Sequence, residues 1–156
     1  MRGRRPNRLR RTPAALVLLV LIACSVSPLG VSRDELRDAE TRWRLSAIAS
    51  YDFVVQRGCF CGPAVTRPVT AQVRDGAFAA LVYADSGTAA DTSLFTDVLT
   101  VDRLHGLIER ALAQSPAAFS AVYDPFFGYP TRLVVDPNAA IADDELTITV
   151  TGFTRR

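Results

Sequence analysis

The strongest constraint on the fold is the alternating pattern near the end of the chain, residues 145–153, "ELTITVTGF". Leu146, Ile148 and Val150 alternate with threonines, so a strand here would bury one face and leave the other in water. A sheet built from such strands carries its apolar side chains on one face, which other elements must cover. The pattern therefore predicts an antiparallel sheet with its helices on one side only.

Two segments have the pattern expected of covering helices. Ser32 and Glu35 have the spacing of a capping box, which predicts a helix from residue 32 to about residue 49. The second helix follows Thr100, its expected N-cap, and ends before Pro116. Its apolar stripe predicts burial of Leu107 and its neighbours against the sheet. The stripe contains Val101, Leu104, Leu107, Ile108, Ala111 and Leu112.

The other periodic segments are rich in β-branched and aromatic residues, which favours strands. The pair Asp75-Gly76 separates two of these segments and is a strong signal for a hairpin. The order is therefore α-β-β-β-α-β-β-β, an α+β fold with about six antiparallel strands and two helices packed on one face. The expected strands cover residues 51–57, 67–74, 77–84, 118–123, 131–135 and 145–153.

The N-terminus has the features of an export signal. Residues 1–12 hold six arginines and no acidic residue, and residues 14–23 form an apolar run too short to span a bilayer. The run ends in "LIAC", which resembles the lipobox of bacterial lipoproteins, where a lipid such as palmitate is attached through the cysteine. We expect a signal peptide over residues 1–23, lipid on Cys24, a tether over 24–32, and one α+β domain over 33–156.

Removal of this signal changes the charge of the chain. The full chain has a formal charge of +2 from 18 basic and 16 acidic residues. All 16 acidic residues follow Cys24, whereas six of the 18 basic residues precede it, which leaves a mature net charge of −4. The basic pI therefore belongs to the signal, and we expect no nucleic-acid partner.

Cys59 and Cys61 in "RGCFCGP" are the two cysteines that remain if Cys24 carries lipid. In an oxidising compartment each is the other's available intramolecular partner, and the flanking glycines allow the chain to fold at Phe60. We favour a local structural disulfide, with a redox-active pair and a metal clip as alternatives. A redox role would need an exposed cysteine beside positive charge, for which Arg57 is the candidate.

No residue pattern predicts a catalytic centre or a cofactor. The only histidine, His105, lies at the edge of a helical stripe, where a half-buried structural role is the ordinary interpretation. The chain has no lysine and no G-x-S-x-G turn. These features argue against the usual hydrolase machinery, and we expect a protein that is not an enzyme.

The densest acidic region precedes the last strand and contains Asp136, Asn138, Asp143, Asp144 and Glu145. An EF-hand is excluded because Ile141 occupies the position that requires glycine and Thr147 the position that requires glutamate. An irregular calcium site formed by Asp136, Asp143, Asp144 and Glu145 stays open. Turn formation through hydrogen bonds to nearby amides is the more ordinary use of such residues.

The segment "DPFFGYP" places three aromatic residues, Phe126, Phe127 and Tyr129, in an expected turn. Because turns lie at the surface, we expect one or two of these rings to be exposed as a contact surface. The others would fold back onto the core.

Several of these motifs together resemble a bacterial lipoprotein family known as domain of unknown function 6174. The resemblance covers residues 43–150 and is carried by "YDFVVQRGCFC", "PVTAQVRDG", "TVDRLHGLIERAL", "VYDPFFGYPTRLVVD" and "IADDELTITV". It implies a lipid-anchored α+β domain on the extracytoplasmic side of the cell membrane or the outer membrane, with no assigned activity.

Two hypotheses follow from the sequence. The first is a non-enzymatic binding or accessory domain with an unknown protein or peptide partner. The second is a thiol-disulfide or redox-sensing envelope protein that acts through Cys59 and Cys61.

Overall fold

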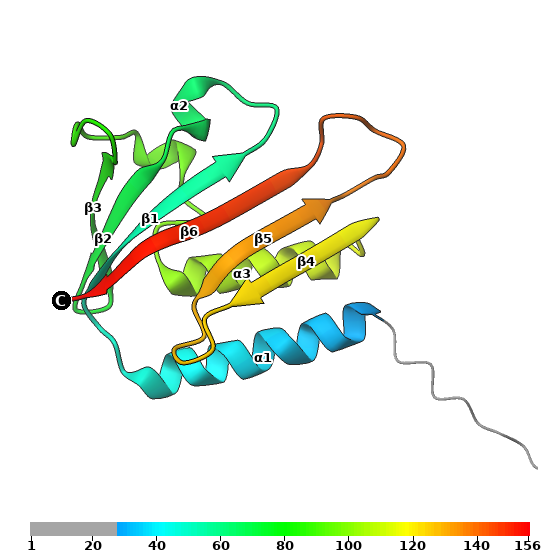
Figure 1. The fold of residues 1–156 in the computed structure, drawn as a ribbon, viewed down its shortest axis with the longest axis horizontal. Helices are drawn as coiled ribbons and strands as arrows, with labels where there is room; N and C mark the ends of the chain where they lie inside the picture. The colour runs from blue at the N-terminus through cyan, green and yellow to red at the C-terminus, as the bar shows by residue number, and fades with distance from the viewer. Residues whose placement is uncertain (1–27) are drawn as a thin grey trace, which may run out of the picture.

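The computed structural model describes residues 28–156, and the expected signal peptide and Cys24 lie outside this part of the chain. Its centre is one six-stranded sheet in which all neighbouring strands are antiparallel, in the order β3-β2-β1-β6-β5-β4 (Figure 1). The strands are β1 (Tyr51–Gly58), β2 (Val69–Arg74), β3 (Ala77–Tyr83), β4 (Ala118–Tyr123), β5 (Pro130–Asp136) and β6 (Leu146–Arg155). The expected α+β class is confirmed, as is the order of the two long helices and six strands along the chain.

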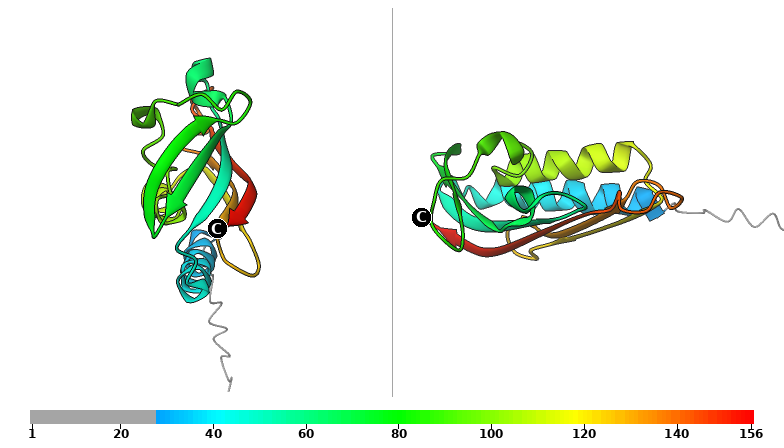
Figure 2. Two further views of the ribbon diagram at one scale, coloured as in Figure 1. Left: turned by 90° about the vertical axis from the view of Figure 1, so that its left-hand side faces the viewer. Right: turned by 90° about the horizontal axis from the view of Figure 1, so that it is seen from above.

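The sheet consists of two three-stranded meanders that meet where β1 pairs with β6. Each meander follows a long helix, α1 (Pro28–Ser46) or α3 (Val101–Ala113). Figure 2 shows both helices on the same side of the sheet, as the alternating strands predicted. None of the helices within residues 28–156 is long and apolar enough to cross a bilayer.

The start of the first helix differs from the prediction. Helix α1 begins at Pro28, so Ser32 lies inside it and is not its N-cap. Proline suits the first turn of a helix because its missing N–H has no partner there in any case. The second helix begins as expected, with the Thr100 side chain accepting a hydrogen bond from the Arg103 amide at 3.2 Å. Two short elements were not predicted, the helical turn α2 (Pro63–Thr66) and the 3-10 turn η1 (Thr92–Leu94).

The core lies between the sheet and the two long helices. Tyr51 joins these layers, because its hydroxyl accepts a hydrogen bond from the Val101 amide at 3.0 Å, at the first residue of α3. Burial raises the pKa of this tyrosine to about 12. Ile108 is buried as expected, but Leu107 is only partly buried, since it lies at the margin of the helix stripe.

No helix of residues 28–156 lies on the opposite face of the sheet (Figure 2). Val54 of β1 lies there between Thr70 of β2 and Thr151 of β6. In the next register, Thr149 lies between Gln56 and Arg132. This open face is therefore mostly uncharged across its centre.

Candidate functional site

Cys59 and Cys61 lie directly after β1 and are joined by a disulfide, with their Cα atoms 5.2 Å apart. The backbone folds at Phe60 so that the Cys61 amide donates a hydrogen bond to the Cys59 carbonyl at 2.8 Å. Phe60 stands at the tip of this turn with 84% of its surface exposed. The cross-linked pair is thus present, and it displays an aromatic ring to solvent.

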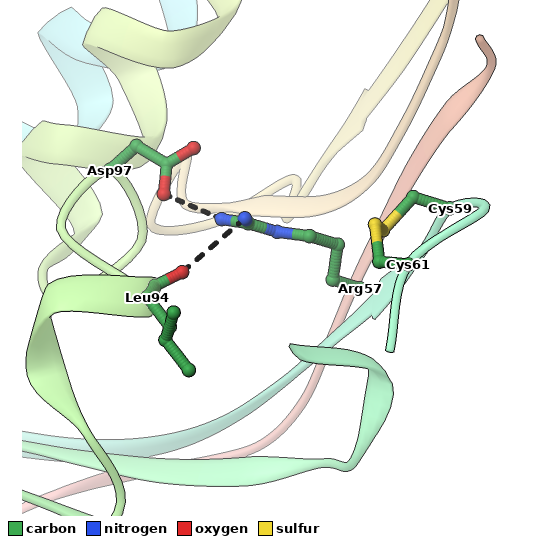
Figure 3. The surroundings of a disulfide bond; sticks show 5 residues. All are labelled: Arg57, Cys59, Cys61, Leu94 and Asp97. Atoms are coloured by element: carbon green, nitrogen blue, oxygen red, sulfur yellow. Dashed lines mark hydrogen bonds and ion pairs between the residues drawn. A yellow bond between two sulfur atoms is a disulfide. The ribbon is translucent and has the colours of Figure 1, made fainter. Parts of the chain in front are cut away.

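The charge around this disulfide differs from the charge that a redox role would need. Arg57 points away from the cysteines (Figure 3) and forms an ion pair with Asp97 at 2.5 Å. Its guanidinium also donates a hydrogen bond to the Leu94 carbonyl at 3.4 Å. Arg57, the candidate for positive charge beside the cysteines, pairs with Asp97 instead, because β1 directs its side chain to the helix side of the sheet.

The charged side chains that line the surface beside this turn are acidic. Asp143 and Glu145 line a shallow hollow together with Cys59 and Phe60. Negative charge disfavours a thiolate, which is the nucleophilic form of cysteine. Cys61 is solvent-exposed, so access favours exchange chemistry while the local charge opposes it.

The aromatic turn between β4 and β5 is held by Asp124. Its carboxylate accepts hydrogen bonds from the amides of Phe126 at 3.0 Å and Phe127 at 2.7 Å. Its own amide donates to the Tyr129 carbonyl at 2.8 Å. Tyr129 stacks on Phe153 at 4.3 Å between ring centroids. Of the three expected contact residues, Phe126 alone is largely exposed, at 80%.

Phe127 is partly buried, and the Arg155 guanidinium lies 5.2 Å from the centre of its ring. The contact surface predicted at this turn is thus reduced to Phe126. Phe127 and Tyr129 instead extend the core at the end of the sheet.

His105 fixes this same turn to α3. Its Nε2 lies 3.0 Å from the Gly128 carbonyl oxygen, and only 3% of the residue is exposed. Burial lowers the pKa of His105, opposed in part by the bond to Gly128 and by the charges of Glu40 and Asp102. The histidine is more deeply buried than the half-buried position expected, and it joins the aromatic turn to α3.

The acidic residues before β6 do not assemble a metal site. Asp136 ends β5, while Asp143, Asp144 and Glu145 lie in the following loop. Within residues 28–156, no three His, Cys, Asp or Glu side chains lie close enough to hold a metal ion. The Asn138 side chain accepts a hydrogen bond from the Ala140 amide at 3.1 Å, which is the turn-forming use of such residues.

Sequence reasoning missed a charged cluster on the open face. Asp52 is only 8% exposed. Its carboxylate contacts Arg74 at 2.6 Å and Arg156 at 2.7 Å. Burial raises the pKa of Asp52, but the hydrogen bonds and charges of both arginines outweigh it, so the pKa lies below its ordinary value. Its partner Arg156 lies at the end of the chain, 104 residues away, and no local pattern links the two.

Sequence reasoning also missed a groove between α1 and β4. It has a volume of about 440 Å³ and is lined by Glu35, Asp38, Arg42, Ala121, Val122, Tyr123 and Pro125. No motif marks it, because it combines two segments that lie about 80 residues apart.

The fold and these surfaces define a small α+β domain with one open sheet face and a disulfide-braced turn. The chain belongs to a family of unknown function (DUF6174), whose family model matches residues 35–155. The matched residues include the cysteine pair, the aromatic turn and the acidic loop. Comparisons with curated proteins and with solved structures found no match.

Proposed function

We propose that this chain is an exported, lipid-anchored domain of the cell envelope that binds a protein or peptide partner and does not act as an enzyme. The observation that carries this proposal is the open face of the sheet. A six-stranded sheet offers a broad surface, and the helices that the structure describes cover one side of it only.

The chemistry of that face suits contact with another polypeptide. Its centre presents Thr147, Thr149 and Thr151 of β6 beside Val54 of β1, a mixture of methyl groups and hydroxyls. The core of a protein interface is poor in charged residues, as the centre of this face is.

The anchoring part of the proposal rests on the sequence before the domain. Residues 25–27 separate the expected lipid site, Cys24, from Pro28, the start of α1. The four Cα–Cα steps from Cys24 to Pro28 span at most about 14 Å, so a lipid on Cys24 would hold the domain close to the bilayer. Helix α1 starts at the end of the domain opposite the C-terminus (Figure 1), so that end would lie nearest the membrane.

Metabolic labelling with an alkyne fatty acid tests the anchor in a bacterial host. We expect the wild-type chain to be labelled and to fractionate with membranes, and Cys24→Ser to lose the label and to keep residues 1–23. The double variant Cys59→Ser/Cys61→Ser is the matched control, since it removes two sulfurs and keeps Cys24. Labelling that persists in Cys24→Ser would refute the anchor.

The second candidate function is thiol-disulfide exchange through Cys59 and Cys61. The exposure of Cys61 favours it, because an attacking thiolate could reach the sulfur. Equilibration with glutathione buffers measures the reduction potential of the pair. A potential near −120 to −270 mV, the range of known oxidoreductases, would favour exchange, whereas a bond that resists the glutathione pool would favour a structural brace.

A further inference from the structure

The two edges of the sheet are treated differently. At the β3 edge, the loop after the strand folds back and pairs with it. The Tyr83 amide donates to the Thr88 carbonyl at 2.8 Å, and the Ala90 amide donates to the Leu81 carbonyl at 3.1 Å. At the opposite edge, β4 pairs with β5 alone within residues 28–156. One edge is thus covered and the other is open.

Charged residues and proline are two features that keep sheet edges from pairing with other strands. The sequence of the open edge, "AFSAVY", contains neither. A bulge between Val122 and Tyr123 interrupts the register only at the last residue. Val122 is 50% exposed. Every second backbone N–H and C=O of such a strand points outward and can pair with another strand.

Helix α1 runs alongside this edge (Figure 1), and the groove described above lies between them. Two polar atoms at this groove, Arg42 Nε and Tyr123 Oη, are shielded from solvent and have no hydrogen-bond partner among the described residues. A buried donor without an acceptor costs free energy, and ordered water is a common partner for such groups in folded proteins.

The groove is also acidic on its helix side. Glu35 and Asp38 face it from α1, and Arg42 is the basic residue of its lining. Burial raises the pKa of Tyr123, with Glu35 and Glu40 adding to the effect, so its hydroxyl keeps its proton and stays a donor at neutral pH. The lining has two carboxylates and one guanidinium, so the groove favours a ligand with positive charge.

From these observations we propose that the outer edge of β4 receives an extended, basic segment of a partner protein as a seventh strand. Backbone hydrogen bonds to β4 would supply affinity, and alternate side chains would enter the groove beside Glu35 and Asp38. This inference rests on the proposed binding function and names the place and the chemistry of the partner.

Site-specific photo-crosslinking in the native envelope tests it with the full-length chain. A benzophenone amino acid is placed singly at Val122 on the open edge, at Thr149 on the open face, and at Val82 on the covered edge. We expect the adduct at Val122 to exceed that at Val82 about tenfold. Peptide mapping of the Val122 adduct should identify a segment with alternating Arg or Lys.

Two kinds of variant separate this contact from chance proximity. Glu35→Arg with Asp38→Arg should lower the Val122 adduct about tenfold, since it replaces attraction with repulsion. Asp34→Arg with Glu109→Arg changes the net charge equally outside the groove and should leave the adduct unchanged. Ser120→Pro should weaken the pairing of the partner strand with β4. Circular dichroism checks that this variant still folds. If it does not fold, the charge variants carry the test.

The outcomes also separate this inference from the proposed function. An adduct from Thr149 without one from Val122 would refute the β4 inference and leave the binding function standing. A Val122 adduct with a second copy of this chain, or one that does not respond to the charge variants, would also refute the inference. Absence of an adduct at every position would contradict both.

Discussion

Gly128→Ala probes the contact that holds the aromatic turn against α1. Gly128 has a φ of +80°, and a Cβ placed on it would run into the backbone carbonyl of Ala39. The left-handed conformation alone costs a non-glycine residue about 1–2 kcal/mol. The forced separation of turn and helix adds about 1–3 kcal/mol, as for overpacking in a core. With weakening of the His105 hydrogen bond, about 1 kcal/mol, we expect a total of about 3–6 kcal/mol.

Gly76→Ala is the matched control. Gly76 has nearly the same φ, +78°, but nothing lies within 4 Å of the position where its Cβ would be. It should therefore lose only the backbone contribution, about 1–2 kcal/mol. Urea unfolding of both variants at 25 °C measures the difference, which we expect to be about 2–4 kcal/mol. Equal losses in the two variants would show that the turn does not pack closely on α1.

Three further predictions follow from the buried residues and the disulfide. Ile108→Ala should cost about 2–5 kcal/mol in urea unfolding because it leaves a cavity, and Leu107→Ala should cost less because Leu107 is only partly buried; equal costs would contradict the helix orientation. Because burial lowers the pKa of His105 in the folded state, the unfolded chain binds the proton first, so the free energy of unfolding should fall as the pH drops below about 6.5. His105→Gln should remove that slope between pH 6.5 and 5, and a slope that persists would contradict the assignment. Reduction of the Cys59–Cys61 bond should lower the free energy of unfolding by about 2 kcal/mol or less, because the closed loop is so short; a much larger loss would mean that the bond holds more than this turn.

Local patterns in the sequence predicted the elements whose periodicity is regular. The alternation in β6 and the stripe on α3 give the correct faces, and the Asp75-Gly76 pair gives the correct hairpin. From these the single covered face of the sheet follows, because apolar strands and amphipathic helices must share one core.

The features that the sequence did not predict depend on contacts between distant segments. The pairing of β1 with β6, the ion pair of Asp52 with Arg156 and the contact of Gly128 with α1 each join residues far apart in the chain. A capping-box pattern at Ser32 was overridden because the helix continues back to Pro28. Arg57 was the candidate for positive charge beside the cysteines because it lies near them in sequence. The pleat of β1 directs its side chain toward Asp97 instead.

Intact-mass measurement of the protein extracted from native membranes tests whether the chain is exported and lipid-anchored. We expect a chain that begins at Cys24, carries the added mass of a diacylglycerol group with or without a further acyl chain, and lacks two hydrogens because Cys59 and Cys61 are bonded. Alkylation of the unreduced, unfolded protein should then label no thiol. A chain that retains residues 1–23, or a Cys24 without lipid, would contradict the proposal that this is an exported, membrane-anchored domain.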